Sequence, residues 1–293
     1  MNEMSRTLRF YYPHPRFPSV SVTGGKCSLN CEHCGGHYLA HMPDVSSPER
    51  LRNYAVDLAE RGGTGMLVSG GSTPSGSVPL TGFTSTMRWI KENTGLILNV
   101  HTGLLDQKMA EELASTGADF FSLDLVGSTE TIKNVYNLNA TTEDYESSLI
   151  YLKDAGVNVV PHITIGLDHG ILKGEDRALE TAVKTDSEVI VINALIPTAG
   201  TAMENTPPPS PETILKYLER ALCSERQISL GCMRPRDRKP DLEKAAIALG
   251  VHRVSLPSNS TVAWARENGY MISKIDACCA IPVSLESRAL RPS

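Results

Sequence analysis

The sequence contains no apolar run long enough to cross a membrane. No stretch approaches the roughly 18 consecutive apolar residues that a spanning helix needs, and residues Met1 to Arg9 lack the apolar centre of a signal peptide. Low-complexity segments, which mark linkers and disordered tails, are absent as well. We therefore expect a cytoplasmic protein without a membrane partner.

The chain also lacks an excess of positive charge. It has 28 lysines and arginines against 33 aspartates and glutamates, which gives a formal net charge of −5. Because nucleic-acid binding requires a basic surface that neutralises phosphates, this charge argues against nucleic acid as the main partner. Seven cysteines, an odd number, do not suit a secreted disulfide framework. Reduced thiols that bind a metal are the better interpretation.

What the sequence does contain is a repeated pattern of strand followed by helix. Short apolar, β-branched runs alternate with amphipathic segments, and 293 residues with 41% hydrophobic content suffice for one domain of barrel size. Eight such units predict a TIM-type (β/α)8 barrel over residues 1–268, with a C-terminal tail, residues 269–293, over its active face. A doubly wound open sheet is the alternative. The predicted strands are Ser19–Thr23, Gly65–Ser69, Leu96–Val100, Phe120–Asp124, Asn158–Ile165, Val189–Asn193, Ile228–Gly231 and Arg253–Leu256.

The most informative stretch follows the first predicted strand. It carries Cys27, Cys31 and Cys34 on one short loop flanked by glycines. Thiolates are soft ligands, and three of them on one loop are suited to hold a metal or an iron–sulfur cluster. A structural zinc or an ordinary four-iron cluster takes four protein ligands, so one position stays open for a ligand that is not protein. The alternative is a zinc loop whose fourth ligand is a nearby histidine: His33, His37 or His41.

Polar residues gather at the carboxyl ends of the predicted strands. Loops at these ends carry the active site in barrel enzymes, so we take these residues as candidates. Asp124 and Arg234 are the candidates for catalytic roles. Asp124 could instead cap a helix, and His101 and His162 could be hydrogen-bonded core histidines. The candidates for binding a cofactor are Ser69, Gly70, Gly71, Ser72, His33, Asn99, His101, Asp124, His162 and Asn193.

The CxxxCxxC spacing of Cys27, Cys31 and Cys34 resembles the signature of the radical S-adenosylmethionine (SAM) enzymes. Gly70–Ser72 lies where that family has a Gly-Gly-Glu-like motif for the methionine amino group, and His33 stands where the family usually has an aromatic residue. The resemblance implies a 4Fe–4S cluster whose unique iron is chelated by SAM. It also implies reductive cleavage of SAM to a 5′-deoxyadenosyl radical, an electron donor such as ferredoxin or flavodoxin, and an anaerobic setting.

Three further cysteines bear on which branch of this family the chain resembles, because only some branches carry an auxiliary iron–sulfur cluster. Cys232 ends the seventh predicted strand, and Cys278 and Cys279 lie in the tail that is expected to cover the same face. Together they are candidates for ligands of an auxiliary iron–sulfur cluster. Adjacent cysteines seldom both ligate one cluster, so one of the pair is the better candidate. The alternative is a small buried Cys232 and a fortuitous Cys-Cys pair.

The segment Val135–Glu143 and the stretch Leu230–Pro235 resemble the biotin synthase branch. Biotin synthase keeps auxiliary-cluster cysteines on inner strands that carry none here, and the closer resemblance is to the archaeal-type, two-protein lipoyl synthases. That resemblance implies sulfur insertion into a protein-bound octanoyl chain, with a lipoyl-carrier protein and a second radical SAM protein as partners. A carbon-skeleton mutase of the methylornithine synthase type and a non-catalytic zinc-binding module are the alternatives.

Overall fold

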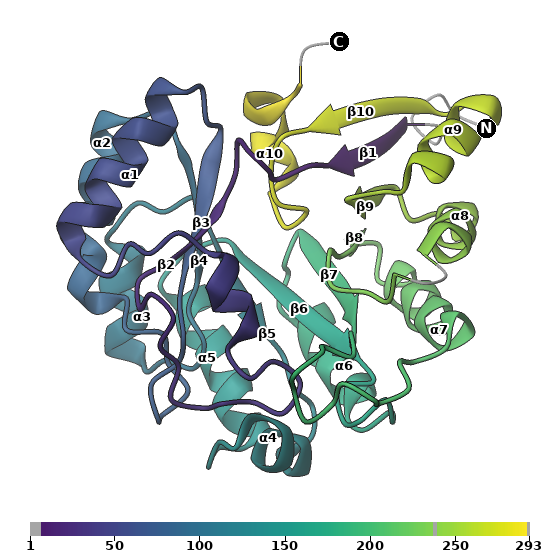
Figure 1. The fold of residues 1–293 in the computed structure, drawn as a ribbon, viewed down its shortest axis with the longest axis horizontal. Helices are drawn as coiled ribbons and strands as arrows, with labels where there is room; N and C mark the ends of the chain where they lie inside the picture. The colour runs from purple at the N-terminus through teal and green to yellow at the C-terminus, as the bar shows by residue number, and fades with distance from the viewer. Residues whose placement is uncertain (1–6, 237–238, 292–293) are drawn as a thin grey trace.

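The computed structural model describes residues 7–236 and 239–291, and this part of the chain folds around one curled sheet of ten strands (Figure 1). The strands are β1 (Thr7–Tyr11), β2 (Ser19–Ser21), β3 (Gly65–Ser69), β4 (Ile97–His101), β5 (Phe120–Asp124), β6 (Val159–Ile165), β7 (Val189–Ala194), β8 (Gln227–Leu230), β9 (Arg253–Ser255) and β10 (Met271–Ile275). Their order is β10-β1-β9-β8-β7-β6-β5-β4-β3-β2. Neighbouring strands are parallel throughout, and the predicted barrel architecture is confirmed.

Helices surround the sheet, as the alternating sequence pattern predicts (Figure 1). Two of them begin at a serine followed by proline: Ser47 accepts a hydrogen bond from the Arg50 amide, and Ser210 accepts one from the Thr213 amide. No helix in residues 7–236 and 239–291 is long and apolar enough to span a membrane. The helices are α1 (Pro48–Glu60), α2 (Thr84–Asn93), α3 (Gln107–Ala114), α4 (Thr129–Tyr136), α5 (Thr142–Asp154), α6 (Glu175–Lys184), α7 (Pro211–Leu222), α8 (Lys239–Leu249), α9 (Asn259–Glu267) and α10 (Val283–Glu286).

Strand alternation divides the apolar side chains into two clusters. Phe121 of β5 belongs to the large cluster between sheet and helices, whereas its neighbour Phe120 belongs to a smaller cluster inside the barrel. The inner cluster combines first or second residues of several strands, such as Ile97 and Val189, with the tail residues Ala280 and Ile281. The barrel is therefore packed with apolar side chains at the amino ends of its strands, and its polar residues lie toward the carboxyl ends.

Two strands, β1 and β10, were not expected from the sequence. They pair with each other along their whole length, from Thr7 opposite Met271 to Tyr11 opposite Ile275. Each is a five-residue segment near one end of the chain, without a βα unit of its own. Because their pairing joins segments that are remote in sequence, no local pattern predicts it.

The C-terminal tail lies at the amino end of the barrel and not over the carboxyl-terminal face, where we expected it. Barrel strands are tilted and staggered, so the end of β10 comes beside the start of β2 and β3, where Asp276 pairs with Arg16 at 3.1 Å. Farther along, the Val283 amide donates to the Glu188 carboxylate just before β7 at 3.2 Å. Arg288 donates to the Gly95 carbonyl before β4 at 2.8 Å. The tail thus closes the bottom of the barrel.

Candidate active site

A cavity of about 430 Å³ occupies the barrel toward the carboxyl ends of its strands. Of the residues that the sequence singled out for a site, Arg234 alone is not among those that line it. The cavity is lined by the cysteines Cys27, Cys31, Cys34, Cys232, Cys278 and Cys279, and by Ser69, Gly70, Gly71, Ser72, His33, Asn99, His101, Asp124, His162 and Asn193.

The three-cysteine loop presents its thiols to this cavity. The Ser72 amide donates to the Cys27 sulfur at 3.3 Å, and the Gly36 amide donates to the Cys34 sulfur at 3.3 Å. Burial, and then the neighbouring Cys34 and Cys27, raise the pKa of Cys31 to about 12. A thiol in that environment loses its proton when a metal supplies compensating positive charge. The donor set, three thiols on one loop that line the same cavity with amides directed at two of them, fits an iron–sulfur cluster.

Gly71 allows the loop after β3 to pack directly on the cysteine loop. A Cβ atom at this position would lie 2.0 Å from the Lys26 carbonyl oxygen and 2.7 Å from Cys27 Cα. The contact is held by the Gly71 amide, which donates to Thr23 Oγ1 at 2.7 Å, and by the Ser28 amide, which donates to the Ser72 carbonyl at 2.8 Å. A larger residue at position 71 must displace the backbone that carries Cys27.

We therefore expect Gly71→Ala to lower the iron content of the anaerobically reconstituted protein well below that of the wild type. The measurement is iron per chain together with the cluster absorbance. Gly25→Ala in the neighbouring loop is the matched control, because a Cβ there meets no atom within 4 Å. If Gly71→Ala and Gly25→Ala bind as much iron as the wild type, the contact is not needed to form the cluster site.

The C-terminal end of α4 supports the cysteine loop from the side. The Glu32 amide donates to the Val135 carbonyl at 2.8 Å, and Asn137, whose backbone is left-handed at φ 53°, donates from Nδ2 to the Asn30 carbonyl at 3.3 Å. Tyr136 packs edge-on against His33 with ring centroids 5.3 Å apart. Burial lowers the pKa of His33 to about 4, although Asp124 opposes this shift, so the imidazole is a neutral flat ring at the cavity wall.

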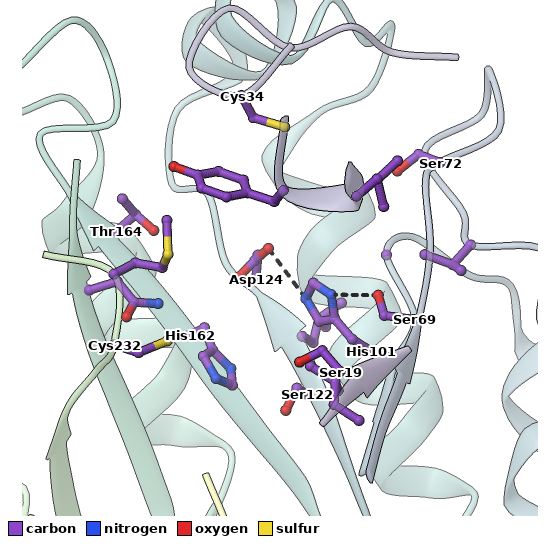
Figure 2. A pocket seen from close by; sticks show the side chains of 18 of the residues that line it. Ser19, Cys34, Ser69, Ser72, His101, Ser122, Asp124, His162, Thr164 and Cys232 are labelled. Carbon is purple, nitrogen blue, oxygen red and sulfur yellow. Dashed lines mark hydrogen bonds and ion pairs between the residues drawn. The ribbon is translucent and has the colours of Figure 1, made fainter. Parts of the chain in front are cut away.

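The last residues of β3, β4 and β5 form a polar row in the cavity (Figure 2). His101 Nε2 lies 3.3 Å from the Asp124 carboxylate, and His101 Nδ1 lies 3.4 Å from Ser69 Oγ. Burial disfavours ionisation of both partners of the ion pair, but their mutual attraction is larger: it raises the pKa of His101 and lowers the pKa of Asp124 to about 2. Asp124 is therefore ionised at neutral pH. It does not cap the following helix, α4, which begins after Ser128.

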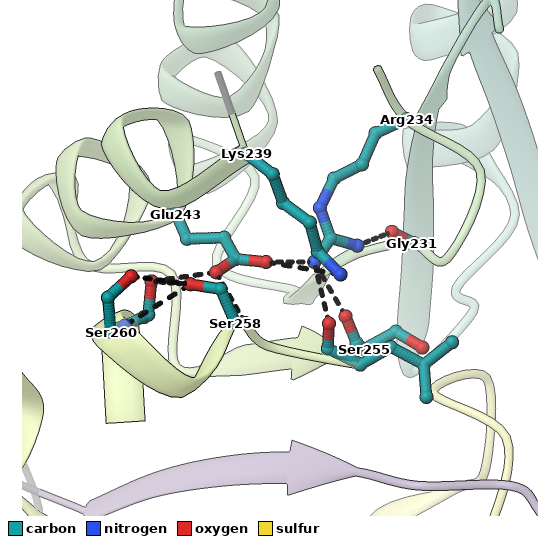
Figure 3. A network of polar contacts seen from close by, with 9 residues as sticks. Gly231, Arg234, Lys239, Glu243, Ser255, Ser258 and Ser260 are labelled. Atoms are coloured by element: carbon teal, nitrogen blue, oxygen red, sulfur yellow. Dashed lines mark hydrogen bonds and ion pairs between the residues drawn. The ribbon is translucent and has the colours of Figure 1, made fainter. Parts of the chain in front are cut away.

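Arg234 lies outside the cavity, which corrects the expectation that it contacts substrate (Figure 3). Its guanidinium is buried, forms an ion pair with Glu243 of α8, and donates to the carbonyls of Gly231 and Ser255, the latter at 2.7 Å. Glu243 in turn accepts a hydrogen bond from the Ser258 amide at the start of α9 at 2.9 Å. This network joins the end of β8 to the two following helices, so Arg234 has a structural role.

The remaining cysteines reach the cavity from two directions. Cys232 follows β8 at the carboxyl end, where its side chain is exposed to the cavity and is not the small buried residue of the alternative. Desolvation inside the barrel raises its pKa to about 11. Cys278 and Cys279 enter from the tail below: Asn99 Nδ2 lies 3.7 Å from the Cys278 sulfur, and Ser229 Oγ donates to the Cys279 carbonyl at 2.8 Å. The three thiols line one cavity although the tail does not cover the active face.

Several polar residues that line the cavity were not among the candidates predicted from the sequence. Ser122 and Thr164 lie two residues from Asp124 and His162 on the same strands, so strand alternation would have placed them on the inner face. Ser122 donates to Asn99 Oδ1 at 3.0 Å. Tyr136 has no such signal, because α4 was not predicted.

A curled parallel barrel with three cysteines on its first loop and a glycine turn packed against them defines an iron–sulfur enzyme of the barrel class. A sequence model of the Radical SAM superfamily matches residues 21–175, and the chain belongs to this superfamily. Membership implies a 4Fe–4S cluster and SAM. When both are bound, they would supply the reductive cleavage of SAM that the superfamily uses. Membership also disfavours the non-catalytic zinc module.

Two biotin synthases are similar in sequence. The protein of Geotalea daltonii is 26% identical over 222 residues, and that of Syntrophotalea carbinolica is 28% identical over 222 residues. Each match covers 72% of this chain and 66% of the relative, so the chain spans just under two thirds of the length of these relatives.

Two solved structures share the fold. HydG, a maturase of the FeFe-hydrogenase, superposes with a TM-score of 0.66 at 17% identity, over 92% of this chain and 66% of HydG. Methylornithine synthase, PylB, superposes with a TM-score of 0.64 at 17% identity, over 91% of this chain and 84% of PylB.

Proposed function

We propose that this radical SAM enzyme abstracts hydrogen from an unactivated C–H bond in order to insert sulfur, most closely in the manner of a lipoyl synthase acting on a protein-bound octanoyl chain. The observation that carries the proposal is the presence of Cys232, Cys278 and Cys279 in the same cavity as the three-cysteine loop. The biotin synthases that match the chain support sulfur insertion as the reaction type.

Each group of residues has a defined task in this proposal. Cys27, Cys31 and Cys34 hold the 4Fe–4S cluster, and the glycine turn Gly70–Ser72 lies beside them to receive the methionine end of SAM. His33, whose pKa is lowered by burial, would pack against the adenine of SAM. The other candidate cofactor contacts are Ser69, Asn99, His101, Asp124, His162 and Asn193, which line the rest of the cavity.

An auxiliary cluster held by Cys232 with Cys278 or Cys279 would supply the sulfur. Soft thiolates are suitable ligands for such a cluster. The cavity wall also carries apolar side chains that suit an acyl chain: Leu29, Leu195, Ile196 and Met233. An electron donor such as ferredoxin or flavodoxin, a lipoyl-carrier protein and a second radical SAM protein are the partners that this function requires.

The iron content tests the auxiliary cluster. We expect about eight iron atoms per reconstituted chain, and about four after Cys232→Ala, because one of two four-iron clusters loses a ligand. Cys223→Ala is the matched control, since this cysteine is exposed at the end of α7. About four iron atoms in the wild type, or an unchanged content in Cys232→Ala, would remove the sulfur-donor proposal.

A carbon-skeleton mutase of the methylornithine synthase type is the second candidate. The polar row of Ser69, His101 and Asp124 in the cavity favours it, because an octanoyl chain offers these side chains few hydrogen-bonding partners. The fold shared with PylB is compatible with it. Such an enzyme needs no auxiliary cluster, so a wild-type content of about four iron atoms would support it.

A further inference from the structure

The turn after Cys278 has the same hydrogen bonds as the turn after Cys34, a ligand of the cluster proposed on the cysteine loop. The Ala280 amide donates to the Cys278 sulfur at 3.3 Å, and the Ile281 amide donates to the Cys278 carbonyl at 3.1 Å. The amides two and three residues after Cys34 likewise donate to its sulfur at 3.3 Å and to its carbonyl at 2.8 Å. An N–H group directed at sulfur stabilises the thiolate, which is the form that binds metal. The backbone around Cys278 is therefore arranged like that of a cluster ligand.

A side chain from the barrel wall supplies a second donor to the same sulfur. Asn99 of β4 is 1% exposed, and its Nδ2 lies 3.7 Å from the Cys278 sulfur. Its Oδ1 accepts a hydrogen bond from Ser122 Oγ of β5 at 3.0 Å, which leaves the NH2 group directed toward the sulfur. A neutral thiol is a weak acceptor, so two N–H donors at one sulfur favour a thiolate, free or bound to metal.

The adjacent Cys279 has different surroundings, although it lines the same cavity. It is 4% exposed and belongs to the apolar cluster inside the barrel, whereas Cys278 is partly buried and packs against that cluster. The Cys279 carbonyl accepts hydrogen bonds from Ser229 Oγ at 2.8 Å and from Arg253 Nη2 at 3.1 Å. The backbone of Cys279 thus anchors the tail below the cavity, while its side chain fills the core.

We infer that Cys278, and not Cys279, ligates the auxiliary cluster together with Cys232, and that Asn99 is a positioning residue for the Cys278 thiolate. The inference rests on the proposed function, from which it takes the presence of an auxiliary cluster in this cavity. Cys232 and Cys278 both line the cavity and are the two less buried of the three thiols. Hydrogen bonds to the sulfur ligands influence the reduction potential of a cluster, so Asn99 also raises the potential of this one.

Matched alanine variants of the two adjacent cysteines test which thiol is the ligand. Iron per chain and the EPR spectrum of the dithionite-reduced protein are measured after anaerobic reconstitution. We expect about eight iron atoms in the wild type and in Cys279→Ala, and about four in Cys278→Ala, because only the latter removes a ligand. Circular dichroism checks the fold of each variant. If Cys278→Ala does not fold, Cys278→Ser keeps the side-chain volume and should change the EPR signal of the auxiliary cluster.

Replacing Asn99 with leucine tests its positioning role, because leucine removes the donor at nearly constant volume. We expect the midpoint potential of the auxiliary cluster to fall in an EPR-monitored redox titration. The potential of the cluster on the cysteine loop should not change. Asn93→Leu is the matched control, since Asn93 is exposed at the end of α2. A purely structural role of Asn99 would not shift one potential selectively, so an unchanged auxiliary potential would overturn this part of the inference.

The iron content also separates failure of the inference from failure of the proposed function. Loss of iron from Cys279→Ala, or a full iron content in Cys278→Ala, would overturn the assignment of Cys278 while the wild type still holds about eight iron atoms. About four iron atoms in the wild type would instead remove the auxiliary cluster, and with it the proposed sulfur insertion.

Discussion

Replacing Cys31 with alanine is expected to abolish reductive cleavage of SAM. Cys31 is 7% exposed and is the second of the three cysteines along the loop. A cluster that has lost one of three protein ligands cannot be retained in the geometry that binds SAM. The measurement is 5′-deoxyadenosine formed by the reconstituted variant with dithionite, for which we expect no signal above background.

Two comparisons make this result specific. Cys223→Ala removes an exposed thiol and should cleave SAM at the wild-type rate. The circular dichroism and thermal unfolding of Cys31→Ala should show a folded protein, because the variant removes one sulfur atom from the large apolar cluster and keeps a small apolar side chain there. Cleavage by a folded Cys31→Ala variant at an appreciable fraction of the wild-type rate would contradict the assignment of this cysteine.

Replacing Glu243 with alanine is expected to have the largest effect on stability. The side chains of Arg234 and Glu243 are 1% and 0% exposed, so the variant leaves a buried guanidinium without its counter-ion. Removing one partner of a buried pair costs about 3–5 kcal/mol, which corresponds to a fall in Tm on the order of 10 °C. Glu243 also accepts from Thr261 Oγ1 at 2.7 Å, and the variant loses this contact between α8 and α9.

An exposed ion pair is the control for Glu243→Ala. Lys108 and Glu112 lie 3.8 Å apart on α3 with side chains 84% and 43% exposed. Such pairs contribute about 1 kcal/mol or less, so Glu112→Ala should leave the Tm nearly unchanged. Similar Tm values for the two variants, measured by thermal unfolding of the protein without added cofactor, would show that the network in Figure 3 does not stabilise the fold.

Local patterns in the sequence were sufficient for the repeat of strand and helix, although not for β1 and β10. β3 and β5 occur at the predicted residues, because alternation of apolar side chains is a property of short segments. The cysteine loop could also be predicted locally, because its three cysteines are close together in the sequence. Active sites of barrel enzymes lie at the carboxyl ends of the strands, and this general rule was enough to predict that Ser69, His101 and Asp124 lie at the same end of the barrel.

Contacts between segments that are remote in sequence decided the role of Arg234 and the position of the C-terminal tail. Arg234 was expected in the active site, and only the position of Glu243 on α8 showed that its charge is satisfied inside the protein. The stagger of the barrel strands, which depends on the whole sheet, brought the tail to the amino end and Cys278 to the cavity from below. The sequence by itself determined the strands β2 to β9 and the cysteine loop, because these depend on neighbouring residues. It did not determine β1 and β10, whose pairing joins remote segments. Tertiary structure alone decided which buried charge meets which partner, because pairing energy depends on distance in space.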